Sequence, residues 1–301
     1  MCANREDVDE ANTLQALLRA ATIQLGSAGV PPARVDAQLL VAHVMGISRS
    51  ELQRLAVLGD TCLNATQQAQ LAELVWQRSQ RVPLQHLTGV APFRRLQLRV
   101  GPGVFVPRPE TELLAGWGIE RLESAASRLA THVVDLCAGS GAIALALATE
   151  FPGAQVSAVE REPEALVWLR RNVADRRPSA GFRVEVVAAD ATAADTLAEL
   201  NGTVDLVLSN PPYLSPDEEV TKEGLLDPPS ALWADDTGLS VIEAVAARAA
   251  VLLRSDGWFG VEHGENQGDR VRALLHSDTW RHVETHLDLA GRDRFTTAQR
   301  L

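Results

Sequence analysis

The chain has 301 residues and a net charge of −11; 46% of its residues are hydrophobic and 22% are charged. This length favours two domains, and the composition is that of an ordinary globular protein. No stretch approaches the roughly twenty consecutive apolar residues of a transmembrane helix, and the polar, acidic first residues do not resemble a secretory signal. We therefore expect a cytoplasmic protein without a membrane span.

Charge and cysteine content bear on three further possibilities: nucleic-acid binding, a disulfide framework and a metal site. Residues 1–85 hold seven basic and eight acidic side chains, and residues 86–301 hold 21 and 31. Binding to nucleic acid normally needs a basic face, so this balance argues against it without excluding a local basic patch. Cys2, Cys62 and Cys137 are too far apart for a disulfide framework or a metal knuckle, which fits a reducing compartment, and we expect no metal site.

Residues 1–80 predict a small all-helical domain. Apolar residues recur at helical spacing in three segments, which glycines and prolines separate. The predicted helices span residues 14–25, 35–44 and 66–78. No chemistry is visible in this region.

Residues 81–108 predict a β-hairpin linker between two domains. Residues 93–100 alternate apolar and polar side chains, Gly101-Pro102-Gly103 predicts a turn, and residues 104–106 resume an apolar strand pattern.

Residues 109–301 predict an α/β domain. Predicted strands 133–136, 154–159, 184–187, 204–208 and 258–261 alternate with helices 142–149, 164–173, 239–253 and 271–275. Such alternation implies a doubly wound sheet that binds ligands at the carboxyl ends of its strands. The final strands, 282–287 and 294–298, have no room for a helix between them and should pair antiparallel. Seven strands ending in such a hairpin resemble the class I (Rossmann-like) methyltransferase sheet.

A glycine-containing turn, Asp135-Leu-Cys-Ala-Gly-Ser-Gly141, follows the first of these strands. Gly139 and Gly141 allow a sharp turn and let a ligand approach bare amides at a helix N-terminus. Glu160 ends the second strand, where a carboxylate can accept both hydroxyls of a ribose. Together they predict a nucleoside ligand. A nicotinamide dinucleotide is disfavoured because the full G-x-G-x-x-G order is missing. Asp190 is equally consistent with an adenine contact and with an ordinary surface turn.

Ser209-Asn210-Pro211-Pro212-Tyr213 follows the fourth strand. The prolines stiffen the loop and remove N–H donors, so the Asn210 side-chain oxygen and the Pro211 carbonyl can accept both hydrogens of a planar –NH2 group. Tyr213 offers an aromatic face to a flat substrate. Holding both N–H bonds directs the nitrogen lone pair at a methyl donor without a strong general base. The exocyclic amines of adenine and cytosine are equally flat, so the motif predicts the shape of the nucleophile and leaves an amide and a flipped base open.

Several motifs, in this order, resemble the HemK-type glutamine-N5 methyltransferases that modify peptide chain release factors. They are Gln85 to Gly89, Phe105-Val-Pro-Arg-Pro-Glu-Thr-Glu112, Asp135 to Ala146, Asn210 to Tyr213, Asp227 to Leu232 and Glu262-His-Gly264. The resemblance covers nearly the whole chain from about residue 80, and the helical domain has the family's size.

The resemblance implies an S-adenosylmethionine-dependent enzyme that methylates the glutamine of the Gly-Gly-Gln loop of a class 1 release factor, with the helical domain helping to dock the factor and a monomer expected. Asn210, Pro211, Pro212 and Tyr213 would bind the target glutamine. Arg108 and Glu112 either line the substrate mouth, or Glu110 and Glu112 favour the positive end of the next helix. The implied cofactor-binding residues are Asp135, Cys137, Ala138, Gly139, Ser140, Gly141, Glu160, Asp190, Ala191 and Asn210.

Cys137-Ala138 stands where the family usually has Gly-Thr, which predicts a tighter turn or an altered helix entry. Three other functions stay open: an adenine-N6 or tRNA methyltransferase, a ribosomal-protein glutamine methyltransferase, and a non-catalytic cofactor-binding protein. His263 is expected to be structural. His282 and His286 are expected on one strand, where their side chains would not converge as on a helix.

Overall fold

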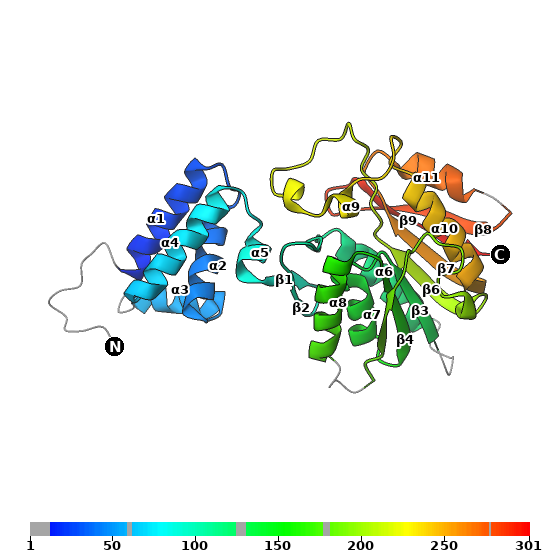
Figure 1. Ribbon diagram of the computed structural model, residues 1–301, viewed down its shortest axis with the longest axis horizontal. Helices are drawn as coiled ribbons and strands as arrows, with labels where there is room; N and C mark the ends of the chain where they lie inside the picture. The colour runs from blue at the N-terminus through cyan, green and yellow to red at the C-terminus, as the bar shows by residue number, and fades with distance from the viewer. Residues whose placement is uncertain (1–12, 59–61, 125–130, 177–180, 277) are drawn as a thin grey trace. The chain divides into compact units, whose positions relative to one another are not determined.

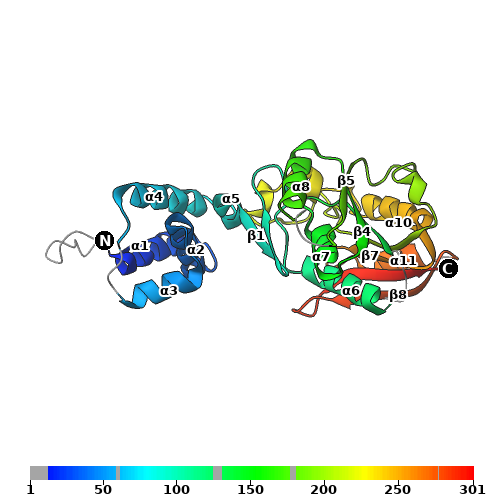
Figure 2. The ribbon, with the colours of Figure 1, turned by 90° about the horizontal axis from the view of Figure 1, so that it is seen from below.

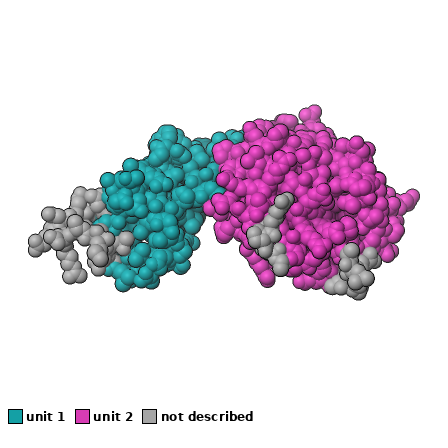
Figure 3. Space-filling model, turned by 60° about the horizontal axis from the view of Figure 1, so that its bottom comes forward, with its two compact units in different colours: residues 1–89, 221–226 teal, residues 90–220, 227–301 magenta. Residues whose placement is uncertain are grey.

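A computed structural model describes residues 13–58, 62–124, 131–176, 181–276 and 278–301. Cys2 lies outside these residues. The chain divides into two compact units, residues 1–89 with 221–226 and residues 90–220 with 227–301 (Figure 3). No helix in the described ranges is long and apolar enough to cross a membrane.

The described part of the first unit is helical. Its helices are α1 (Leu14–Ser27), α2 (Ala33–Met45), α3 (Arg49–Leu58), α4 (Ala65–Ser79) and α5 (Leu84–Thr88). The Thr13 side chain accepts a hydrogen bond from the backbone N–H of Ala16 and so caps α1, and Asn64 forms a capping box with Gln67 at the start of α4. Leucines and valines from α1 to α4 form the core of this unit. The three helices expected from the sequence are present, and α3 and α5 were not expected.

Six residues from far along the chain complete the first unit. Glu223, in the segment 221–226, pairs with Arg78 at 3.0 Å and with Arg81 at 2.7 Å. Arg78 also pairs at 2.7 Å with Asp36, and both of these side chains are buried. A single arginine of α4 therefore connects α2 to a loop from the second half of the sequence.

The linker hairpin differs from the one expected. Its strands are β1 (Val90–Phe93) and β2 (Leu96–Arg99), which pair antiparallel, so the chain turns at Arg94 and Arg95. Arg94 adopts a positive φ of 50°, and its guanidinium binds the Glu150 carboxylate at 2.7 and 2.9 Å. Residues 104–106 form no strand. Residues 102 and 103 do form a turn, but the hairpin itself closes earlier, because the alternating pattern continues through a turn that only these tertiary contacts reveal.

The second unit contains a seven-stranded sheet in the order β5-β4-β3-β6-β7-β9-β8. β3, β4, β5, β6 and β7 are parallel neighbours, and β9 lies antiparallel between β7 and β8, which confirms the antiparallel final pair. The strands are β3 (Thr131–Leu136), β4 (Ala154–Glu160), β5 (Val184–Ala188), β6 (Val204–Ser209), β7 (Leu253–Glu262), β8 (Trp280–Leu287) and β9 (Asp293–Arg300).

Helices cover both faces of this sheet (Figures 1 and 2). One core forms with α6 (Thr111–Ser124), α7 (Ala142–Glu150) and α8 (Pro163–Arg176), and the other with α10 (Ser240–Leu252) and α11 (Gly268–Leu275). Most residues of the central strands β3, β4 and β6 are buried because both faces of the sheet are covered. The helix expected next to Glu112 is α6, and its first residue enters the site described below. The short α9 (Pro229–Leu232) follows the 3-10 turn at Gly224–Leu226.

Candidate functional site

A pocket of the second unit opens where β3, β4, β5 and β6 end, as expected for a doubly wound sheet. Loops that follow these four strands line it, together with residues 103–107 and the region of α9. The site residues named from the sequence that line it are Asp135, Cys137, Ala138, Gly139, Ser140, Glu160, Asp190, Ala191, Asn210, Pro212 and Tyr213. Gly141, Pro211, Arg108 and Glu112 do not appear among its lining residues.

The turn after β3 has three residues with positive φ: Cys137 at 65°, Gly139 at 56° and Gly141 at 88°. Gly141 is required by packing as well, because a Cβ there would lie 2.6 Å from the Leu169 side chain. Cys137 thus adopts the left-handed conformation that glycine tolerates best, and its substitution leaves that backbone geometry in place. Desolvation raises the pKa of its thiol to about 12, which disfavours the reactive thiolate form.

Asp135 is fully buried at the end of β3. Its Oδ2 accepts a hydrogen bond of 2.9 Å from the backbone N–H of Ala144 in α7, whereas its Oδ1 has no hydrogen-bond partner among the described residues. Burial raises the pKa of this carboxyl to about 8. A buried carboxyl oxygen that lacks a partner and borders a pocket is suited to a positively charged or hydrogen-donating ligand group.

Glu160 and Asp190 are held by backbone amides at the ends of β4 and β5. Glu160 accepts 2.8 Å hydrogen bonds from the N–H groups of Gly139, Arg161 and Glu162. Asp190 accepts from the N–H and the hydroxyl of Thr192, which lowers the pKa of its carboxyl. Both carboxylates are therefore fixed in place at the pocket wall.

Asn210 lies opposite the glycine turn. Its Nδ2 donates a 3.1 Å hydrogen bond to the hydroxyl of Thr111, the first residue of α6. Since the amide is planar, its Oδ1 points away from Thr111. Thr111 itself lines the pocket. Sequence reasoning missed it because the hydroxyl lies 99 residues away from Asn210 along the chain.

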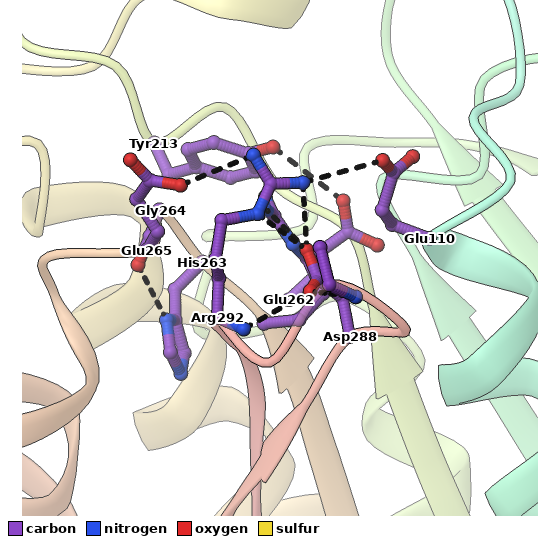
Figure 4. Close-up of polar contacts among 10 residues, drawn as sticks. Glu110, Tyr213, Glu262, His263, Gly264, Glu265, Asp288 and Arg292 are labelled. Atoms are coloured by element: carbon purple, nitrogen blue, oxygen red, sulfur yellow. Dashed lines mark hydrogen bonds and ion pairs between the residues drawn. The ribbon is translucent and has the colours of Figure 1, made fainter.

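Next to the loop of Asn210, polar side chains gather at the end of β7 and in the connection between β8 and β9 (Figure 4). The Tyr213 hydroxyl faces Oε1 of Glu262 at 3.5 Å. The Tyr213 carbonyl accepts a 2.9 Å hydrogen bond from Gln267, which anchors the loop. Burial raises the pKa of Glu262 to about 7, while Arg294 lowers it. Glu262 does not line the pocket, and it lies behind the tyrosine that does.

The remaining residues named from the sequence have structural partners. Arg108 pairs with the buried Asp227, which also accepts a 3.1 Å hydrogen bond from the N–H of Val106. Glu112 lies in the first turn of α6, where the helix dipole favours a carboxylate. His263 is fully buried, and its ring nitrogens contact the Gly264 carbonyl at 2.9 Å and the Thr296 hydroxyl at 2.8 Å.

Family models match both units. The model described as the PrmC N-terminal domain matches residues 16–89, and the methyltransferase small domain matches residues 111–228.

The chain is also similar along its length to curated proteins. A release factor glutamine methyltransferase of Mycolicibacterium smegmatis is 45% identical over 96% of this chain and 98% of its own. A 4-amino-L-phenylalanine/4-methylamino-L-phenylalanine methyltransferase of Streptomyces pristinaespiralis is 38% identical over 91% of each chain. Among solved structures, the T. thermophilus 16S rRNA N2 G1207 methyltransferase is 22% identical, with a TM-score of 0.50 over 70% of this chain and 50% of its own, a likeness of fold alone.

Proposed function

Because the chain belongs to the release factor glutamine methyltransferase family, we propose that it transfers a methyl group from S-adenosylmethionine to the side-chain N5 of the glutamine in the Gly-Gly-Gln loop of a class 1 release factor. The observation that carries this proposal is the hydrogen bond from Asn210 Nδ2 to the Thr111 hydroxyl. It fixes the side-chain amide so that Oδ1 of Asn210 points away from Thr111 and can accept a hydrogen bond from a substrate.

The pocket residues fit the cofactor. The Asp135 Oδ1, buried and without a partner among the described residues, suits the ammonium group of the methionine part. A Cβ at Gly139 would meet nothing within 4 Å, so a ligand can approach the backbone there. Glu160 would accept the ribose hydroxyls, and Asp190 with Ala191 would border the adenine. The bound group supplies a methyl on a positively charged sulfur.

The residues of the loop after β6 would prepare the nucleophile. The lone pair of an amide nitrogen is delocalised, so the gain comes from orientation rather than from a strong base. The Asn210 Oδ1 accepts one N–H of the glutamine amide, and Tyr213 lies against the amide plane. The motif also suggests the Pro211 carbonyl as a second acceptor. Pro211 is buried and does not line the pocket, whereas Asn210 does, so the proposed role in binding the amide is better supported for Asn210 than for Pro211.

A second candidate substrate is a free aromatic amine. The Streptomyces pristinaespiralis relative is named for 4-amino-L-phenylalanine, whose –NH2 group is also flat. That relative, at 38% identity, is less similar than the release factor glutamine methyltransferase of Mycolicibacterium smegmatis at 45%. We favour the release factor because the PrmC N-terminal domain matches residues 16–89, and a separate helical unit can contact a protein substrate outside the pocket.

We further propose that the enzyme acts in the cytoplasm. We also propose that it acts as a monomer, since one unit of the chain supplies the whole lining of the pocket.

The test is a side-by-side incubation of the purified protein and labelled S-adenosylmethionine with a class 1 release factor, a ribosomal-protein fraction, RNA and 4-amino-L-phenylalanine. We expect label in the release factor alone, and peptide mapping should place it on the glutamine of the Gly-Gly-Gln loop. Asn210→Ala should lose transfer by about 100-fold or more, because it removes the acceptor that orients the nucleophile, while cofactor binding by calorimetry persists. Label in another substrate, or full activity of the variant, would overturn the proposal.

A further inference from the structure

Asp227 is a buried carboxylate to which the proposed reaction assigns no role. It is the first residue of the motif Asp227 to Leu232, and its side chain is fully buried. Its Oδ1 accepts a 3.1 Å hydrogen bond from the backbone N–H of Val106, and its Oδ2 pairs with the guanidinium of Arg108. Both partners belong to one short segment, 121 and 119 positions earlier in the chain.

The two segments that Asp227 joins are rich in proline. Arg108 lies between two prolines, and two more prolines follow Asp227. Proline fixes φ and has no N–H to donate, so such segments are stiff but poorly suited to regular backbone pairing. A charge-assisted contact between two stiff segments therefore fixes the neighbouring residues of both.

Hydrogen bonds continue from Arg108 to the residue proposed to bind the target nitrogen. The Arg108 carbonyl accepts a 3.2 Å hydrogen bond from the N–H of Thr111. The Thr111 hydroxyl then accepts the 3.1 Å hydrogen bond from Asn210 Nδ2. The position of the Asn210 side chain thus depends on where the segment of Arg108 lies.

The far side of the Asn210 loop leads back to Asp227. The N–H of Leu214 donates a 2.9 Å hydrogen bond to the carbonyl of Leu232, the last residue of α9, and α9 begins two residues after Asp227. These contacts form a closed path through three segments. We call them the rim: residues 105–111, 210–214 and 227–232.

The rim borders the part of the pocket assigned to the substrate. Each of its segments supplies lining residues, among them Phe105, Tyr213 and Ala231. The guanidinium of Arg108 lies over the Phe105 ring, 4.8 Å from its centroid. The residues proposed to hold the ammonium, ribose and adenine of the cofactor instead lie at the ends of β3, β4 and β5.

We propose that Asp227 is a positioning residue for the methyl transfer: it closes the rim and so holds Phe105 and the Asn210 loop at the spacing that confines the flat target amide. The inference rests on the proposed function, because it concerns the residues that would bind the target nitrogen. Asp227 does not line the pocket itself. Since orientation is the main source of rate in this reaction, a looser rim should slow transfer and leave the cofactor bound.

The test compares Asp227→Asn with the wild-type protein. The asparagine oxygen can still accept from Val106, but its amide carries no charge for Arg108, so the rim loosens with little change of volume. We expect kcat for the release factor to fall by about 10- to 100-fold. KM for the release factor and the calorimetric affinity for S-adenosylmethionine should be unchanged. The calorimetric stoichiometry counts the folded molecules, and kcat is expressed per molecule that binds cofactor.

Glu150→Gln is the matched control, because it makes the same carboxylate-to-amide change in another ion pair of the second unit. The Glu150 side chain is 7% exposed, binds Arg94 at 2.7 and 2.9 Å and does not line the pocket. This variant should lower the midpoint of thermal unfolding, as Asp227→Asn should, but leave kcat unchanged. The comparison separates positioning from a general loss of stability.

Arg108→Met tests the other side of the contact. Methionine keeps an apolar stem against Phe105 but cannot pair with Asp227, so kcat should again fall by about tenfold or more. Because both residues act through one contact, the variant that combines Asp227→Asn and Arg108→Met should be no slower than the worse single variant.

Wild-type kcat in Asp227→Asn, an equal loss of kcat in Glu150→Gln, or loss of cofactor binding in Asp227→Asn would overturn the inference. Multiplicative losses in the double variant would overturn it as well. If Asp227→Asn does not fold, Arg108→Met replaces it: the expected loss of kcat supports the inference, and wild-type kcat refutes it. A wild-type protein that does not methylate the release factor would instead refute the proposed function.

Discussion

At the scale of single residues, Asp135 has the most direct measurable consequence. Burial raises the pKa of its carboxyl to about 8, and one of its oxygens has no hydrogen-bond partner in the described part of the chain. A ligand with an ammonium group beside this carboxyl would favour its ionised form and lower its pKa. Cofactor binding at pH 7 should therefore release a proton from Asp135, and affinity should increase as pH rises toward 8, up to about tenfold per pH unit.

Calorimetry in buffers of different ionisation enthalpy would measure that proton release. Asp135→Asn removes the titrating group and should bind S-adenosylmethionine more weakly but with little dependence on pH between 6 and 8. Equal affinity of the wild-type protein across this range would contradict the assignment of Asp135 to the cofactor ammonium.

The backbone conformation of Cys137 could not be predicted from the sequence. In the sequence its position beside Ala138 suggested an altered turn, because the family usually has glycine and threonine there. In the structure its φ of 65° preserves the left-handed backbone. A cysteine can adopt this conformation at a cost of about 1–2 kcal/mol. Packing of α7 and α8 around the turn holds the backbone in this conformation despite that cost.

At the scale of elements, the buried ion pair between α2 and α4 makes a second prediction. Asp36 and Arg78 have side chains only 7% and 6% exposed, and they meet at 2.7 Å. Asp36→Ala would leave the guanidinium buried with less compensation, so the free energy of unfolding should fall by about 3 kcal/mol. Urea unfolding followed by circular dichroism measures it. Glu51→Ala, which removes an exposed pair with Arg54, is the matched control and should leave stability nearly unchanged. Equal effects would show that burial of the pair is unimportant.

The position of the turn in the linker hairpin could not be predicted from the sequence. Alternation in residues 93–100 correctly indicated extended chain, but it carries no signal for the turn at Arg94. That turn is held by an ion pair to Glu150, 56 residues away. The bounds of α6 were not predicted for a related reason. Its glycines, Gly116 and Gly118, weaken a helical pattern, yet Gly118 is needed where a Cβ would lie 2.7 Å from the Leu208 side chain.

At the scale of the whole molecule, mutations can test whether the helical unit docks the release factor while the second unit binds the reacting groups. In the helical unit, Ile23 and Val57 are 62% and 85% exposed and border one groove. If this unit docks the release factor, Ile23→Asp with Val57→Asp should lower kcat/KM for the whole factor by about tenfold, the loss of one well-packed contact region. A short peptide that contains the Gly-Gly-Gln sequence should be methylated as before.

The control for docking is Val251→Asp, the same apolar-to-charged change at an exposed residue of α10 in the second unit. It should affect neither substrate. If the double variant of the helical unit methylates the whole factor at the wild-type rate, this groove takes no part in docking.

The sequence by itself determined the alternation of strands and helices, the antiparallel final pair and the placement of Asp135, Glu160 and Asn210 at strand ends, because these follow from local periodicity and from the topology of doubly wound sheets. Tertiary structure alone decided that Thr111 holds Asn210 and that Glu262 faces the Tyr213 hydroxyl. These contacts join residues 99 and 49 positions apart, and a hydrogen bond between distant side chains leaves no periodic trace in either segment.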